Sequence, residues 1–162
     1  MQFWDAYSDN RKIFRTRFLE NHEATGELVK YNDADLYNFF QEFEAKGYLK
    51  DTIVYFMSDH GQHFIVGHLP VIPDNSRLEE NFLPLLIILV PNDIPKENIK
   101  FLESNQQHFM TGIDIYSSIK SIAVGGNANS NYFESYSLLY DTLPPNRNCD
   151  TYKGKINFSN CW

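Results

Sequence analysis

An acidic and a basic side chain stand together where an apolar stretch of the sequence stops. Asp59 and His60 follow "TIVYFM" after a single residue, Ser58, and precede Gly61. Carboxylate and imidazole are common ligands of divalent metal ions. Because neighbouring residues of a strand point to opposite faces, both can reach one ion only if the strand ends near Ser58 and the backbone turns. The alternative is a polar turn in which Asp59 bonds its own backbone and His60 lies in solvent.

Two apolar runs predict the strands that would position this pair. "DTIVYFM" is continuously apolar, β-branched and aromatic, which is typical of a strand buried on both faces of a parallel sheet. "FLPLLIILVP" repeats the pattern, with Pro84 near its start and Pro91 at its end. In such sheets ligands bind at the carboxyl ends of the strands, which is where Asp59 and His60 fall.

Helical patterns alternate with these runs, which indicates an α/β fold. A helix is expected to begin at a cap provided by Asn32 or Asp33 and to stop at Gly47. Its apolar residues recur at helical spacing: Leu36, Phe39, Phe40 and Phe43. A second amphipathic helix is expected over 114–124, with Asp114 as its cap. After it, Asn, Ser, Tyr and Pro dominate, so irregular structure is expected, with one short strand around "SYSLLY".

Length and charge narrow the classes of protein. The 162 residues suffice for one domain, at roughly one domain per 150 residues. A net charge of −7 argues against nucleic acid as a partner, because phosphate binding needs clustered Lys and Arg. No apolar run approaches the roughly 20 residues that span a bilayer, so no membrane span is expected.

The two cysteines bear on the cellular compartment. The first residues lack the apolar core of a signal peptide, which taken alone indicates a cytoplasmic protein. Cys149 and Cys161 lie in the polar tail, however, where a disulfide would be useful only in an oxidising compartment. The triplet beginning at Asn157 is a glycosylation acceptor. The tail carries more weight, so a secreted or lumenal protein is expected, as part of a longer chain, with a cytoplasmic protein as the weaker alternative.

Several segments, in this order, resemble the alkaline-phosphatase-like superfamily, which includes phosphodiesterases and sulfatases. The matching stretches are "FFQEFEAKGYLKDTIVYFMSDHGQHF" and "RLEENFLPLLIILVP". Within that superfamily the chain is similar to animal sulfatase-like proteins of nematodes and insects, through "NHEATGE", "SDHG", the helix around "DIY" and the tail "PPNRNC". The resemblance runs from about Phe18 to Trp162.

This resemblance implies a partial three-layer α/β/α fold with an irregular tail. Residues 1–126 would be the C-terminal part of the sulfatase-like domain, and 127–162 a loop-rich tail closed by a disulfide. The implied function is the C-terminal lobe of a metal-dependent hydrolase of phosphate or sulfate esters. Relatives carry their nucleophile and first acidic metal ligand further upstream, so this chain is expected to be inactive unless an N-terminal lobe completes it. The alternative is a non-catalytic binding or structural module.

The resemblance also implies roles for individual residues. Asp59 and His60 match the metal ligands, and an Asp-His pair favours zinc or manganese, although sulfatases usually bind calcium through Asp-Asn. His22 matches a histidine that binds a second ion or contacts the substrate. Phe18 stands where the two-metal form has Asp, so one metal is expected, with His22 as a donor to the substrate. His68 resembles a histidine near the leaving group. For His22 and His68 the alternative is an exposed loop histidine.

Overall fold

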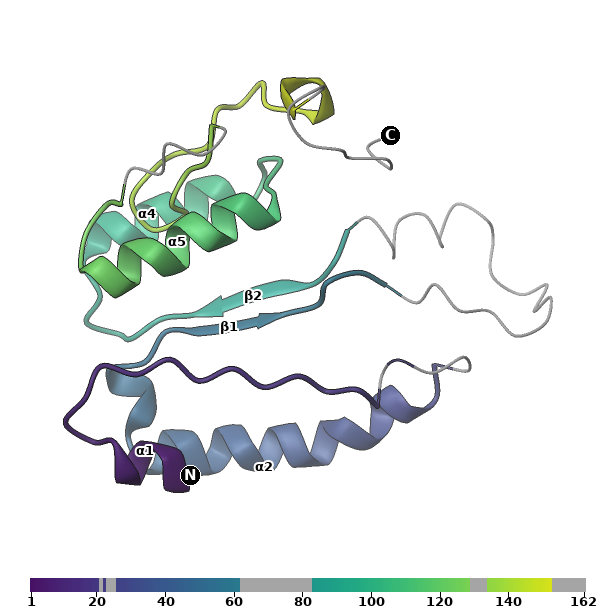
Figure 1. Ribbon diagram of the computed structural model, residues 1–162, viewed down its shortest axis with the longest axis vertical. Helices are drawn as coiled ribbons and strands as arrows, with labels where there is room; N and C mark the ends of the chain where they lie inside the picture. Colours follow the sequence, from purple (N-terminus) through teal and green to yellow (C-terminus); the bar gives the residue numbers. More distant parts are fainter. Residues whose placement is uncertain (21, 23–25, 62–82, 129–133, 153–162) are drawn as a thin grey trace. The chain divides into compact units, whose positions relative to one another are not determined.

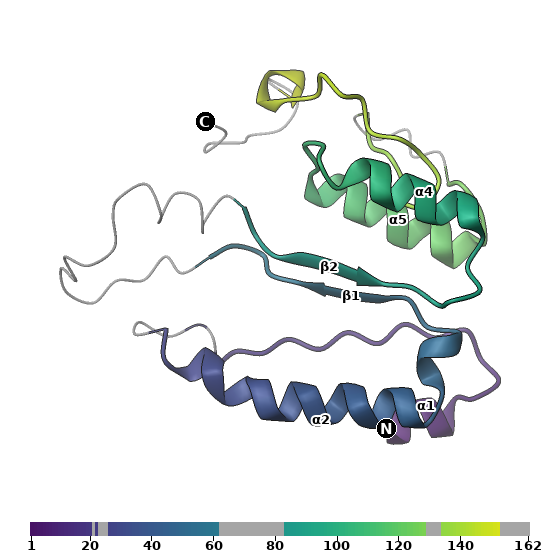
Figure 2. The same ribbon diagram turned by 180° about the vertical axis from the view of Figure 1, so that it is seen from behind.

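The computed structural model describes residues 1–20, 22, 26–61, 83–128 and 134–152. The chain divides into two compact units, Met1–Asn92 and Asp93–Trp162, each of which is described by itself. Helices and a small two-stranded sheet make this an α/β protein (Figures 1 and 2). Across the described ranges, no helix is both long enough and apolar enough to cross a membrane. The predicted boundary between 126 and 127 stays a prediction.

The elements of the first unit include the first helix and both strands that the sequence predicts. The observed order is α1 (Gln2–Ala6), η1 (Leu28–Tyr31), α2 (Asn32–Ala45), η2 (Tyr48–Lys50), β1 (Val54–Met57) and β2 (Leu86–Leu89). The helix predicted from the Phe spacing is therefore present as α2. Gly47 follows its last turn with a φ of 77°, a conformation that favours glycine, so the predicted stop is confirmed.

The start of α2 differs slightly from the prediction. Its N-cap is Tyr31, and Asn32 is already the first helical residue. The 3-10 turn η1 runs directly into the helix, so the backbone before Asn32 is already helical and neither Asn32 nor Asp33 adopts the extended conformation of a cap.

Aromatic rings build the core of the first unit. Phe43 of α2 is 1% exposed, and the ring of Trp4 from α1 meets it edge-on at a centroid distance of 4.8 Å. Phe14 and Tyr48 also pack against Trp4, at 5.0 and 6.1 Å. Each fully buried ring of this size is worth about 1.5–3 kcal/mol of transfer free energy. These contacts tie α1 and the extended segment after it to α2.

The two predicted strands are present, but their pairing differs from the expectation. β1 and β2 are antiparallel, with Val54 opposite Leu89 and Met57 opposite Leu86. The expected parallel arrangement is thus wrong for this pair. An unbroken apolar run indicates burial but says nothing of strand direction. The sequence pattern therefore could not distinguish parallel from antiparallel pairing. Burial is also incomplete, because Met57 and Ile87 are 51% and 44% exposed.

The second unit consists of two helices and the segment that covers them. α4 spans Lys96–Asn105 and α5 spans Gly112–Val124, and a 3-10 turn η3 follows at Cys149–Tyr152. The predicted helix around "DIY" is confirmed as α5, but it begins two residues earlier than expected, with Thr111 as N-cap. Asp114 is the third residue of the helix, and its Oδ2 accepts the Thr111 backbone N–H at 2.7 Å. Its carboxylate caps the helix start from inside the first turn.

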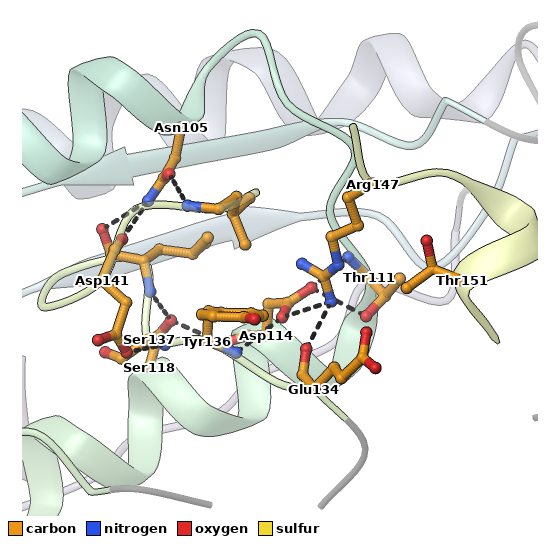
Figure 3. A network of polar contacts seen from close by, with 12 residues as sticks. Asn105, Thr111, Asp114, Ser118, Glu134, Tyr136, Ser137, Asp141, Arg147 and Thr151 are labelled. Carbon is orange, nitrogen blue, oxygen red and sulfur yellow. Dashed lines mark hydrogen bonds and ion pairs between the residues drawn. The ribbon is translucent and has the colours of Figure 1, made fainter. Parts of the chain in front are cut away.

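The expected strand around "SYSLLY" is absent, and the segment is irregular and turn-like. Helix side chains bind its backbone where a neighbouring strand would otherwise do so (Figure 3). The Leu138 N–H donates to Ser118 Oγ at 2.8 Å, and Asn98 Nδ2 donates to the Leu139 carbonyl at 2.7 Å. Because these polar groups are satisfied by α4 and α5, the segment is buried without a sheet partner.

Candidate functional site

The end of β1 is shaped by the side chain of Ser58. The Ser58 N–H donates to the Leu85 carbonyl at 3.0 Å, as in a regular antiparallel pair. The return bond differs, because the Leu85 N–H donates to Ser58 Oγ at 2.9 Å. The hydroxyl thus takes the ladder position of a backbone carbonyl, and the chain leaves the strand at this residue. Asp59 and His60 follow in a bend, where the alternation of strand side chains no longer applies.

Both carboxylate oxygens of Asp59 accept hydrogen bonds. The His60 N–H donates to Oδ1 at 3.1 Å, which is the local turn bond expected of an Asp in this position. Arg17 Nη2 lies 3.3 Å from Oδ2, and the carboxylate side chain is 66% exposed. Desolvation is the largest single influence and raises the pKa of Asp59. The hydrogen bonds from the backbone N–H groups of Asp59 and His60, together with the positive charges of protonated His60 and of Arg17, outweigh it, so the pKa lies below its ordinary value. Asp59 is therefore ionised at neutral pH.

The imidazole of His60 is oriented by the next residue. Its Nδ1 lies 2.8 Å from the Gly61 carbonyl oxygen. A carbonyl can only accept, so Nδ1 carries the proton of this hydrogen bond. In the neutral ring the lone pair is then on Nε2, which is the usual arrangement of a metal-binding histidine whose other nitrogen is held by a carbonyl.

Asp59 and His60 supply two donors of the kinds that bind divalent metal ions. An ionised carboxylate and an imidazole with its lone pair on Nε2 are two suitable donors for zinc or manganese. The Arg17 guanidinium lies beside Oδ2, so this oxygen already forms an ion pair with a cationic group. In the part of the chain that the structure describes, no group of three or more His, Cys, Asp and Glu side chains could hold a metal. Water, a substrate oxygen or another segment would have to supply the remaining ligands.

The other predicted residues are placed as follows. His22 is exposed in the turn after Leu19, whose carbonyl accepts its backbone N–H at 2.9 Å. His68 lies outside the described residues, so its role stays a prediction. Cys149 begins η3, and its predicted partner Cys161 lies outside the described residues, as does the triplet at Asn157. The disulfide and the glycosylation site therefore stay predictions.

One residue of this site, Arg17, and the hydrogen-bonding role of another, Ser58, are not predicted by the sequence. Arg17 comes from the extended segment between α1 and η1, 42 residues before Asp59. Nothing in "RKIFRTRF" distinguishes it from the other basic residues nearby. Ser58 was predicted as the point where the chain turns, but its hydroxyl bond to Leu85 depends on the pairing of β1 with β2. Small hydroxyl residues bond to nearby backbone groups at turns, and this tendency is the only local signal.

Comparison with known proteins defines the family. The family described as "Protein of unknown function (DUF229)" matches residues 1–162, and the chain belongs to it. This is a sulfatase-like family, in agreement with the resemblance found in the sequence motifs. No curated protein and no solved structure matches the chain.

Proposed function

We propose that this chain is the C-terminal lobe of a metal-dependent hydrolase of phosphate or sulfate esters. The observation that carries the proposal is the end of β1. There the ionised carboxylate of Asp59 and the imidazole of His60, with its lone pair on Nε2, follow each other in one bend. The bend begins after Ser58, whose hydroxyl ends the strand pairing. Membership in a sulfatase-like family supports the same class of chemistry.

In this proposal Asp59 and His60 hold one divalent ion, zinc or manganese in preference to calcium. When bound, such an ion neutralises charge on an ester oxygen and lowers the pKa of an attacking hydroxyl. His22 donates a hydrogen bond to the substrate, and His68 lies near the leaving group. The surrounding fold is the three-layer α/β/α arrangement, to which β1 and β2 contribute two strands.

The proposal also assigns the remaining catalytic groups to an N-terminal lobe. The nucleophile and the first acidic metal ligand come from that lobe, so the 162 residues alone do not turn over substrate. The complete protein is secreted or lumenal, with Cys149 and Cys161 paired and Asn157 glycosylated. No turnover of nitrophenyl phosphate or nitrophenyl sulfate is expected from this chain, and measurable turnover would contradict the assignment of the nucleophile.

Metal binding is the direct test. Isothermal titration of the chain with Mn²⁺ or Zn²⁺ should show one site, which Asp59→Ala should abolish. Asp51→Ala is the matched control, because Asp51 precedes β1 at its opposite end and its removal changes the net charge equally. An unchanged titration for Asp59→Ala would remove that residue from the site.

A non-catalytic sulfatase-like binding or structural module is the second candidate. It is favoured by the two-donor site, since no third His, Cys, Asp or Glu joins Asp59 and His60 within the described ranges. The same titration separates the two functions. A chain that binds neither metal would support the module and exclude the metal-dependent lobe.

A further inference from the structure

The contact between Arg17 and Asp59 joins two segments that lie far apart in the sequence. Arg17 Nη2 and Asp59 Oδ2 are 3.3 Å apart, and the two residues are separated by 42 positions. Arg17 belongs to the extended segment that runs along α2 and β1 (Figures 1 and 2). This segment is anchored at its start by Phe14, whose ring packs 5.0 Å from Trp4. The segment thus presents a guanidinium to the carboxylate at the end of β1.

We propose that Arg17 has two successive partners at this site: the Asp59 carboxylate before a divalent ion binds, and the anionic oxygens of the substrate afterwards. The inference rests on the proposed metal site and adds a substrate-binding residue to it. Arg17 is neither a metal ligand nor a proton donor in this arrangement. Its role is to neutralise the negative charge of Asp59 before the ion binds, and then to hold a tetrahedral oxyanion next to the ion.

Because both side chains are exposed, exchanging one partner for the other costs little free energy. The Arg17 and Asp59 side chains are 58% and 66% exposed, so water screens their attraction. Exposed ion pairs contribute little to stability, and their partners separate readily. A divalent ion carries twice the charge of the guanidinium and coordinates the carboxylate directly, so it displaces the weaker partner.

The chemistry of the released side chain suits the second role. A guanidinium carries five N–H donors in a planar fork that matches phosphate and sulfate oxygens. Since its segment stays anchored by Phe14, the displaced Arg17 remains beside the ion. The substrate oxyanion would then meet the metal on one side and the guanidinium on the other.

Calorimetric titrations of Arg17→Gln test both roles, because the two roles predict opposite changes in the affinities for metal and for oxyanion. Without competition from the guanidinium, Mn²⁺ should bind Asp59 roughly two- to fivefold more tightly than in the wild type. Inorganic phosphate should bind the Mn²⁺-loaded variant about tenfold more weakly, because a charge-assisted pair of hydrogen bonds is lost. A parallel series with sulfate distinguishes the two ester classes. A purely structural residue would not raise one affinity while it lowers the other.

Arg15→Gln is the matched control, since it removes the same charge two residues away on the same exposed segment. It should leave both affinities near the wild-type values. Equal Mn²⁺ affinity in Arg17→Gln and the wild type would overturn the first role, and equal affinity for both oxyanions would overturn the second. If the wild type binds no Mn²⁺ at all, the proposed metal site fails, and this inference fails with it.

Discussion

Within the residues that the structure describes, two Arg–Asp pairs have similar N···O distances and opposite surroundings. Arg17 and Asp59 lie 3.3 Å apart with side chains 58% and 66% exposed. Arg147 and Asp114 lie 3.0 Å apart with side chains 1% and 0% exposed. Each pair brings together residues more than thirty positions apart in the sequence. The difference between them is burial and the number of other bonds that each carboxylate makes.

The buried pair is the centre of the second unit (Figure 3). Among the described residues, the Asp114 carboxylate accepts four hydrogen bonds: from the Thr111 N–H and hydroxyl, from the Tyr136 N–H and from Arg147. The Arg147 guanidinium also lies over the rings of Tyr136 and Tyr152, at 5.3 and 4.9 Å. A carboxylate with this many buried partners cannot exchange them for a ligand without a large cost.

The exposed pair has the opposite properties. Asp59 accepts a local turn bond from the His60 N–H and pairs with the exposed Arg17, and its lowered pKa keeps it ionised. A charge that is already in water loses little when it changes partners. The comparison indicates that Arg147 and Asp114 hold the fold together, whereas Arg17 and Asp59 are available for binding.

The largest expected effect comes from removing the buried carboxylate. Asp114→Ala should lower the free energy of unfolding of the second unit by about 3–5 kcal/mol, because it leaves the Arg147 charge buried without its partner. Hydrogen exchange measured by mass spectrometry should show faster exchange in α5 and around Tyr136. Exchange in α2 serves as the internal control. A loss below 1 kcal/mol would contradict the structural role of this pair.

An intermediate effect is expected at Ser118, which links α5 to the tail segment. Its Oγ accepts the Leu138 N–H at 2.8 Å and donates to the Asp114 carbonyl at 2.7 Å, fully buried. Ser118→Ala leaves a buried N–H unsatisfied and should cost about 1–3 kcal/mol in urea unfolding. Ser104→Ala, which removes an exposed bond to the Phe101 carbonyl, should cost much less. Equal costs would show that burial does not set the difference.

A small effect on stability is expected at the exposed pair. Asp59→Ala should change the free energy of unfolding by only about 0–1 kcal/mol, as for other exposed ion pairs. The same variant should lose metal binding, so stability and binding separate at this site. Urea unfolding monitored by circular dichroism, in the absence of metal, provides the measurement. A loss as large as that of Asp114→Ala would mean that Asp59 is structural.

The smallest effect is expected from a second exposed carboxylate, Asp5 of α1. A hydrogen bond from the Tyr48 hydroxyl is the main cause that lowers the Asp5 pKa; desolvation opposes it, and Lys46 reinforces it. A lowered folded-state pKa contributes stability above the unfolded value of 3.8, and this contribution is lost as the pH falls through the folded value. Asp5→Asn should therefore lower the urea midpoint slightly at neutral pH. Below the lowered folded-state pKa the difference from the wild type should vanish, because the carboxyl is then protonated in both the folded and the unfolded state.

Much of the local structure was predictable because it follows from short-range patterns. The Phe spacing predicts α2, Gly47 predicts its end, and the apolar run before Ser58 predicts β1. The helix α4 was not predicted, although Pro95 before "KENIKFLESN" is a signal for a helix start. The prediction of a strand around "SYSLLY" is wrong because side chains of two helices bind the backbone of this segment. No local sequence pattern indicates such partners.

The candidate site was predictable in part for the same reason. Asp59 and His60 were identified from the run that precedes them, and Ser58 from the need for a turn. Arg17 could not be found in this way, because its contact depends on the path of a segment 42 residues earlier. The capping position of Asp114 was nearly correct, yet its pairing with Arg147 depends on the packing of the tail.

The sequence by itself determined which residues carry charge, where the main helices and strands run, and that an acid and an imidazole follow a strand. Only the tertiary structure decided which carboxylate is buried and which is exposed. Asp59 lies between Ser58 and His60, and Asp114 lies between two isoleucines, but neither local context specifies which distant segments cover the carboxylate. A side chain is buried when segments that are distant in the sequence cover it. The strength of its ion pairs then depends on that burial. Neighbouring residues in the sequence therefore cannot specify either property.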